Sequence, residues 1–279
     1  FKLIWRRLTM KFDMKKFMAV LAAMMMVFAL AACGGDKEPA KQGGDTNDGP
    51  SAFELYNQAE EKMAALTDVE YKMDVAMKMA AEGQNMDMTM GGTMKQVKVD
   101  ENNFNLQFNM NMDMSAMGAG TMDMNMYYTN GYLYYDMGQM GQMKVAMDMA
   151  AAEEQMNANG MAELDESWVK ESSVDGQNVH MVLDGTKMTG MVDEYAGSMA
   201  ASLQGGEITM GDVTVDLVLD AEGLPTTYKM VMPMTVNTQG IEMTMDMDMT
   251  MDVIATEGVT IEFPEGMDSW MEVDASALQ

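Results

Sequence analysis

The chain has 279 residues, of which 48% are hydrophobic, and its formal net charge at pH 7 is −27. Such an excess of acidic residues repels phosphate backbones and anionic headgroups, so the composition excludes a nucleic-acid-binding protein. Because the chain contains one cysteine, a disulfide bond within it is also excluded.

Residues 14–33 have the layout of an export signal. Two lysines, Lys15 and Lys16, precede an uncharged apolar run over residues 17–29. This segment is short for a membrane-spanning helix and is typical of a signal peptide. We therefore expect residues 1–32 to be a signal peptide together with some upstream residues.

The end of this segment resembles the lipobox of bacterial lipoproteins. The four residues that carry the resemblance are Leu30, Ala31, Ala32 and Cys33. It implies cleavage before Cys33, a diacylglycerol on its thiol, and a protein anchored on the extracytoplasmic face of the cell membrane. The alternative is an ordinary cleaved signal with a cysteine nearby by chance.

After removal of residues 1–32, the chain would contain 11 lysines, no arginine and 43 acidic residues. Without arginine it has no side chain that can bind a phosphate with two parallel hydrogen bonds. Residues 34–50 contain no large apolar side chain, so 33–50 is expected to be a lipidated flexible tether. Residues 51–279 are long enough for one sizeable domain.

A helix opens this domain. Ser51 and Glu54 have the spacing of a capping box, and apolar residues follow at steps of three and four, which predicts an amphipathic helix over 52–66. From Val69 the apolar residues alternate with polar or small ones, which predicts a strand that ends at a turn over 82–85.

The same alternation predicts a series of further strands. They cover 86–90, 104–114, 121–126, 132–135, 167–174, 178–184, 207–220, 225–237, 241–255 and 259–263. The sequence Thr129-Asn130-Gly131 predicts a hairpin and Asp175-Gly176 a turn, whereas Pro233 suggests a bulge or an edge position. A second helix is predicted over 187–203. The stretch 146–164 is ambiguous, with helix predicted around 150–156.

These elements predict an α+β fold in which a large curved antiparallel sheet, an open half-barrel, is covered by two or three helices. Three segments, 126–136, 174–183 and 217–225, resemble the LolA/LppX-like bacterial lipoproteins, and within them an uncharacterised lipoprotein family of Gram-positive anaerobes. The resemblance implies a half-barrel over 51–279 whose concave face holds acyl chains or lipid-like molecules, as in characterised relatives. The arginine found at the cavity of some carriers has no counterpart in this chain.

Methionine is unusually frequent, with 43 residues, and it recurs at every second position of several predicted strands. These runs are 77–79, 86–90, 110–114, 122–126, 147–149, 230–234 and 243–251. Because alternate residues of a strand share one face, each run should form a methionine row on one side of the sheet. The acids between them should face the other side: Asp87, Asp113, Asp123, Asp246, Asp248 and Asp252.

Three interpretations of the methionine rows remain open. Methionine can replace leucine and valine as core filler, which gives similar burial energy. It can instead form an adaptable surface for an apolar ligand. The residues expected to bind such a ligand are Met110, Met112, Met122, Met124, Met230, Met232, Met234, Met243, Met245, Met247 and Met249. Thioethers also suit Cu(I) or Ag(I), but the single histidine, His180, lies outside every row.

No nucleophile, phosphate-loop or metal-protease motif is present, so we expect no catalytic residues, no cofactor, no metal centre and no enzymatic activity. The expected function is a membrane-anchored lipoprotein that binds or carries a hydrophobic or amphiphilic ligand. A structural or sensory envelope lipoprotein without a small ligand is the alternative, and a soft-metal binder is the third. Aromatic residues that either rim a cavity or pack against a helix are Trp168, Trp270, Tyr127, Tyr128, Tyr132, Tyr134 and Tyr135.

Overall fold

The computed structural model describes residues 49–81, 84–100, 103–113, 115, 120–138, 141–147, 164–188, 207–238 and 241–274. These residues contain the α-helix α3 (Ala52–Ala64) and two short 3-10 helices, η3 (Glu166–Trp168) and η4 (Met267–Ser269). The strands are β1 (Asp68–Ala81), β2 (Gln84–Lys98), β3 (Phe104–Asp113), β4 (Thr121–Thr129), β5 (Tyr132–Asp136), β6 (Gln142–Ala146), β7 (Val169–Asp175), β8 (Asn178–Leu183), β9 (Glu207–Met210), β10 (Val213–Leu219), β11 (Pro225–Thr238), β12 (Ile241–Ala255) and β13 (Met271–Val273).

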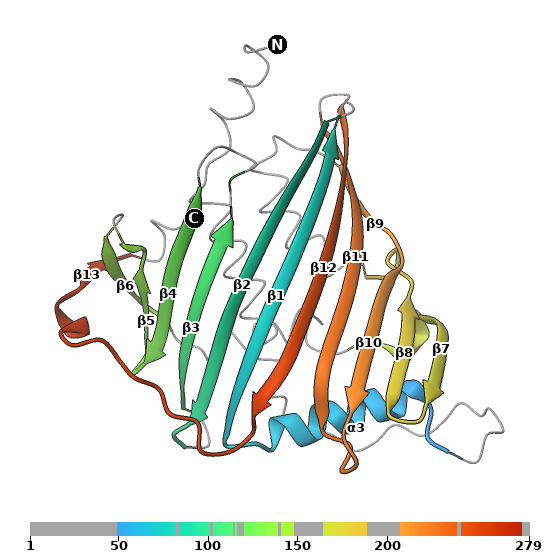
Figure 1. Ribbon diagram of the computed structural model, residues 1–279, viewed down its shortest axis with the longest axis horizontal. Helices are drawn as coiled ribbons and strands as arrows, with labels where there is room; N and C mark the ends of the chain where they lie inside the picture. Colours follow the sequence, from blue (N-terminus) through green and yellow to red (C-terminus); the bar gives the residue numbers. More distant parts are fainter. Residues whose placement is uncertain are drawn as a thin grey trace.

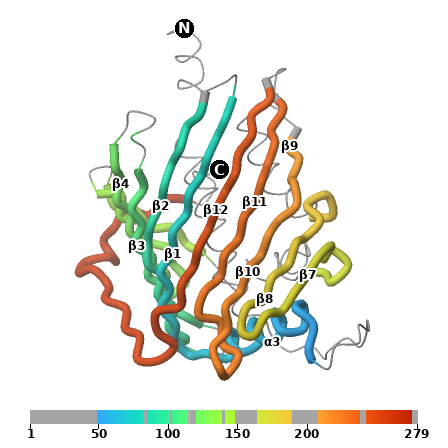
Figure 2. Tube along the Cα trace, turned by 45° about the vertical axis from the view of Figure 1, so that its right-hand side comes forward, coloured from blue at the N-terminus to red at the C-terminus, as the bar shows by residue number. Residues whose placement is uncertain are grey.

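All of these strands belong to one 13-stranded sheet (Figure 1). Its order is β13-β6-β5-β4-β3-β2-β1-β12-β11-β10-β8-β7, and β9 pairs with the far end of β11. Neighbours pair antiparallel except for β13 and β6, which are parallel. The long strands β2, β1, β12 and β11 lie at the centre, and the sheet curves on both sides of them without closing (Figure 2).

Helix α3 begins at the predicted capping box. The backbone N–H of Glu54 donates to Ser51 Oγ at 3.1 Å, and the Ser51 N–H donates to Glu54 Oε2 at 2.8 Å. These two bonds satisfy donors that the first helical turn would otherwise leave unpaired. The helix crosses one end of the sheet and buries Ala59 and Met63 against it (Figure 1).

Two predicted turns are confirmed. Asn130 and Gly131 join β4 to β5 with φ of 53° and 77°, the left-handed geometry that a two-residue hairpin requires. Gly176 joins β7 to β8 with φ of 60°. Asparagine and glycine tolerate this backbone region better than other residues, which is why the sequence signal was specific.

The α+β fold class is wrong for the described residues, which form a predominantly β structure with α3 as their one α-helix. Within this part of the chain, two or three helices covering the sheet are therefore not found. Most of the predicted helix 187–203, and the stretch around 150–156, lie outside the described residues. The first two residues of the predicted helix, 187 and 188, belong to a turn.

Two strand predictions also need correction. The predicted strand 207–220 is interrupted at Gly211 and Asp212, which separate β9 from β10. Pro233 lies within the interior strand β11, opposite this interruption, and its carbonyl accepts the Gly211 N–H at 2.8 Å. A proline is tolerated there because no regular ladder bond is required on that side. The predicted strand 259–263 is instead an extended connection that leads to β13.

Candidate ligand-binding face

The predicted methionine rows continue from strand to strand across the sheet. Directly paired residues point to the same side, so the strand registers identify which side chains share a face. One such row runs through Met122, Met112, Met90, Val75, Met249, Met230, Val215 and Met181, from β4 to β8. The adjacent row runs through Met124, Met110, Gly92, Met73, Met251, Tyr228 and Leu217.

We call this side of the sheet the methionine face, defined by the two rows above and by Met77, Met88, Met232, Met234, Met243, Met245 and Met247 beside them. The structure brings all of the expected ligand-binding methionines to this face. Buried among them are Met110, Met112, Met124, Met234, Met245, Met247 and Met249. Partly exposed are Met122, Met230, Met232 and Met243.

The opposite side of the sheet is acidic, as the alternation predicts. Its six expected carboxylates, Asp87, Asp113, Asp123, Asp246, Asp248 and Asp252, are exposed or half-exposed. Lys78 pairs in register with both Asp87 and Asp246, so some acids have a lysine beside them on the strand surface. The sheet therefore separates a thioether side from a charged and hydrated side.

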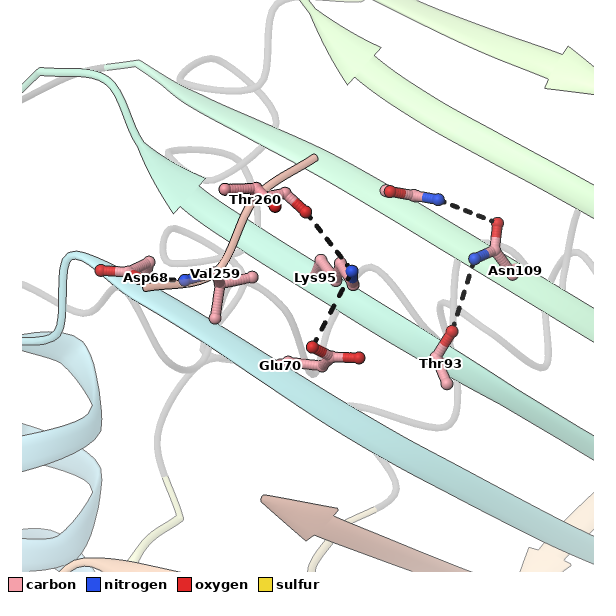
Figure 3. Close-up of polar contacts among 8 residues, drawn as sticks. Asp68, Glu70, Thr93, Lys95, Asn109, Val259 and Thr260 are labelled. Atoms are coloured by element: carbon pink, nitrogen blue, oxygen red, sulfur yellow. Dashed lines mark hydrogen bonds and ion pairs between the residues drawn. The ribbon is translucent and has the colours of Figure 1, made fainter. Parts of the chain in front are cut away.

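The connection from β12 to β13 crosses this acidic side. Val259 donates its N–H to Asp68 Oδ2 at 2.6 Å, and Lys95 Nζ donates to the Thr260 carbonyl at 3.4 Å (Figure 3). The Val259 bond, as its largest cause, lowers the pKa of Asp68. Lys95 Nζ also lies 3.9 Å from Glu70 Oε2, which links β2 to β1 (Figure 3). The connection is thus held to β1 by Asp68 and to β2 by Lys95.

Further along, the same connection packs on aromatic side chains. Tyr127 and Tyr134 point away from the methionine face and form a cluster with Met267 and Trp270. The rings of Tyr134 and Trp270 are 5.8 Å apart and nearly perpendicular. These two tyrosines therefore pack against the short 3-10 helix η4, to which Met267 belongs. Trp168, in contrast, packs in the cluster that α3 shares with β8 and β10.

The remaining predicted aromatic residues divide between the two sides. Tyr128 belongs to a small cluster with Leu106 and Leu133, and Tyr135 packs against both this cluster and the methionine face. Burial raises the pKa of Tyr135 to about 12. Tyr132 packs near Tyr134 and lies under Lys144, whose Nζ is 5.0 Å from its ring centroid.

His180 lies on the acidic side, where its Nδ1 is 2.6 Å from Asp216 Oδ1. Both side chains are about half exposed, so this pair resembles an ordinary surface contact. Among the residues that the structure describes, no group of three or more His, Cys, Asp or Glu could hold a metal ion. In the same part of the chain, no helix is long and apolar enough to cross a membrane.

A polar group that no sequence motif indicated lies beside the methionine face. Tyr228 occupies a position in the second row, and its hydroxyl donates to Glu60 Oε1 of α3 at 2.9 Å. Burial raises the pKa of Glu60 to about 7, an effect that the Tyr228 hydrogen bond partly opposes. Burial, with Glu60 as a second cause, also raises the pKa of Tyr56. The position of Glu60, four residues after Tyr56, places both on one side of α3, but no sequence pattern pairs Glu60 with the distant Tyr228.

Several predicted site residues lie outside the described part of the chain. These are Leu30, Ala31, Ala32 and Cys33 of the lipobox-like sequence, nearly all of the tether 33–50, and the methionines at 114 and 149 of two runs. The signal peptide, the tether and the lipid anchor therefore stay predictions.

The model of one protein family, described as a family of unknown function (DUF6612), matches residues 51–267. A comparison with curated proteins found no match. Among solved structures, a DUF1329 family protein from Desulfovibrio piger is 12% identical, with 82% of this chain and 98% of that chain covered and a TM-score of 0.29.

Two other solved structures are also similar. The ywiB protein from Bacillus subtilis is 8% identical, covers 68% of this chain and 94% of its own, and has a TM-score of 0.22. A β-barrel-like DUF1849 protein from Brucella abortus is 11% identical, covers 68% and 100%, and has a TM-score of 0.19. Similarities at this level support no conclusion about function.

Proposed function

We propose that this chain, which belongs to the DUF6612 family of unknown function, is a membrane-anchored extracytoplasmic lipoprotein that binds a hydrophobic or amphiphilic ligand on its methionine face. The proposal includes a likeness to LolA/LppX-like carriers, which rests on the sequence segments quoted above. The observation that carries it is the continuity of the thioether surface across β4, β3, β2, β1, β12 and β11.

The chemistry of methionine supports this use of the face. Its side chain is unbranched and polarizable, so a surface built from it can adjust to apolar partners of different shapes. The partly exposed Met230 and Met232 lie next to one another along β11, where a ligand can contact them without displacing buried core. The acidic opposite side keeps such an apolar sheet soluble.

A neutral fluorescent probe tests ligand binding. N-phenyl-1-naphthylamine becomes fluorescent in apolar surroundings, so its titration measures affinity for the methionine face. We expect saturable binding that Met232→Gln weakens roughly fivefold, because a polar amide replaces part of an apolar contact. Met271→Gln is the matched control, because Met271 is 63% exposed and lies on the edge strand β13.

The alternative interpretations make different predictions in this titration. If methionine is only core filler in a structural or sensory lipoprotein, the probe does not saturate and Met232→Gln lowers stability alone. Equal weakening by Met232→Gln and Met271→Gln would contradict binding at the methionine face. Soft-metal binding by the methionine rows stays a separate prediction from the sequence.

The lipid anchor is tested by fractionation of cells. Replacing the thiol in Cys33→Ala removes the site of acylation and should move the protein from the membrane fraction to the soluble extracytoplasmic fraction. A protein that stays with the membrane after this substitution would contradict acyl anchoring. Ligand binding on the methionine face does not depend on that result.

A further inference from the structure

The carboxyl group of Glu60 lies at the boundary between the two large apolar clusters of the protein. Tyr228, to which it is hydrogen-bonded at 2.9 Å, packs against both clusters. Tyr56 of the same helix packs in one of them, and the side chain of Met63, three residues after Glu60, is buried in the other. Glu60 as a whole residue is partly exposed, and its carboxyl group lies beside the apolar side chains of both clusters.

No cationic side chain balances this carboxylate within the described residues. Lys62, the nearest lysine in sequence, donates its Nζ to the carbonyl of Glu222 at 2.6 Å. The described ion pairs join other residues, and Oε2 of Glu60 has no hydrogen-bond partner among the described residues. A half-buried carboxylate without a counter-charge favours a ligand that supplies one.

We propose that Glu60, Tyr56 and Tyr228 form a head-group subsite for an amphiphile with an ammonium or quaternary ammonium head, whose alkyl chain lies along the methionine face. This inference rests on the proposed function, because it assigns the polar end of the same ligand. It selects a cationic amphiphile over anionic and uncharged ones of the same chain length.

Three physical effects favour binding of an amphiphile with a cationic head at this subsite. The positive head compensates the Glu60 carboxylate, and the tyrosine rings offer π faces that attract a cation. The adjacent methionine face removes the alkyl chain from water, which is favourable for each methylene buried. An anionic head is repelled by the carboxylate, and an uncharged head leaves it without a counter-charge.

The titration of Glu60 supports this assignment. The groups that face it are Tyr228 from β11, which donates the hydrogen bond, and Tyr56 from its own helix; Tyr71 of β1 interacts electrostatically with Tyr228. Burial is the largest cause of its raised pKa. Because a cation binds the ionised form, its affinity should increase as the pH rises through about 7.

Calorimetric titration at pH 8 with two probes tests the proposal. Dodecyltrimethylammonium and tetraethylene glycol monododecyl ether have the same alkyl chain, and both are used below their micelle concentrations. We expect the wild-type protein to bind the cation roughly tenfold more tightly than the uncharged ether. Glu60→Gln, which keeps an acceptor for Tyr228, should abolish this preference and leave binding of the ether unchanged.

Two further variants separate the subsite from general effects of charge and folding. Glu61→Gln removes an exposed acid from the same helix, so it should keep the preference if the local carboxylate matters and not the net charge. Tyr228→Phe keeps the carboxylate and an aromatic face, so it should also keep the preference.

The possible failures can be told apart. If the ether binds but the cation has no advantage, or if Glu60→Gln keeps the advantage, the head-group subsite is wrong and the proposed function stands. Loss of the preference in Glu61→Gln to the same extent would also overturn the subsite. If neither probe binds the wild-type protein, both proposals are wrong.

Discussion

Glu60 is an acidic side chain whose protonation is coupled to folding. Its pKa of about 7 in the folded protein is above the value of 4.5 expected without the fold, because burial disfavours the charged form. Folding therefore favours the protonated group. The stabilisation is fully present below about pH 4.5 and is lost as the pH rises through about 7.

We expect the free energy of unfolding to fall more steeply between pH 5 and pH 8 in the wild-type protein than in Glu60→Gln. The difference should be about 2 kcal/mol, because one unit of pKa shift corresponds to about 1.36 kcal/mol and partial exposure reduces the effect. Urea unfolding at a series of pH values measures it. Glu61→Gln should follow the wild-type profile, and parallel wild-type and Glu60→Gln profiles would show that burial does not shift this group.

At the scale of single elements, Gly92 in the middle of β2 controls how closely β2 and β3 approach. A Cβ atom at this position would lie 2.5 Å from the carbonyl oxygen of Asn109 on β3, so backbone would have to move. At the neighbouring Gly91, the nearest atom would be the Asp74 side-chain oxygen at 3.3 Å, which can rotate away.

Gly92→Ala should therefore lower the free energy of unfolding by about 1–3 kcal/mol, the range typical of steric strain at a packed position. Gly91→Ala should lower it by less than about 1 kcal/mol and serves as the matched control. Chemical denaturation followed by circular dichroism measures both. Equal effects of the two substitutions would contradict the close approach of β3 at Gly92.

The elements that the sequence predicted are those with local signals. The capping box at Ser51, the hairpin at Asn130-Gly131 and the period-two methionine runs each depend on residues close in sequence. The short strand β13 was missed because its three residues pair in parallel with the distant β6, which local alternation does not indicate. The break at Gly211-Asp212 was missed although the sequence carries a signal for it, because the apolar residues change there from even positions, ending at Met210, to odd positions, beginning at Val213.

In the candidate site, too, features with a local sequence signal were predicted, and contacts between residues far apart in sequence were not. Alternation alone predicted that each methionine run lies on one side of its strand, and the registers of β1, β2, β3, β4, β11 and β12 place these runs on the same side of the sheet. The pairing of Glu60 with Tyr228 joins residues 168 positions apart and could not be predicted from either local pattern. The predicted cover of two or three helices is not found among the described residues, where α3 is the one α-helix.

At the scale of the whole molecule, the sheet has two chemically different sides. The side chains of the central strands place thioethers on one side and carboxylates on the other, and the connection after β12 covers part of the acidic side. A net charge of −27 repels anionic surfaces. An apolar ligand is therefore expected on one side of the sheet only.

Methionine oxidation provides the most direct test of this expectation. Hydrogen peroxide converts accessible methionine to its sulfoxide, and peptide mass spectrometry gives the rate for each residue. With tetraethylene glycol monododecyl ether bound, we expect slower oxidation of the partly exposed Met122, Met230, Met232 and Met243 and an unchanged rate at Met271, which is 63% exposed. Unchanged rates at those four residues, or equal slowing at Met271, would contradict ligand binding on the methionine face.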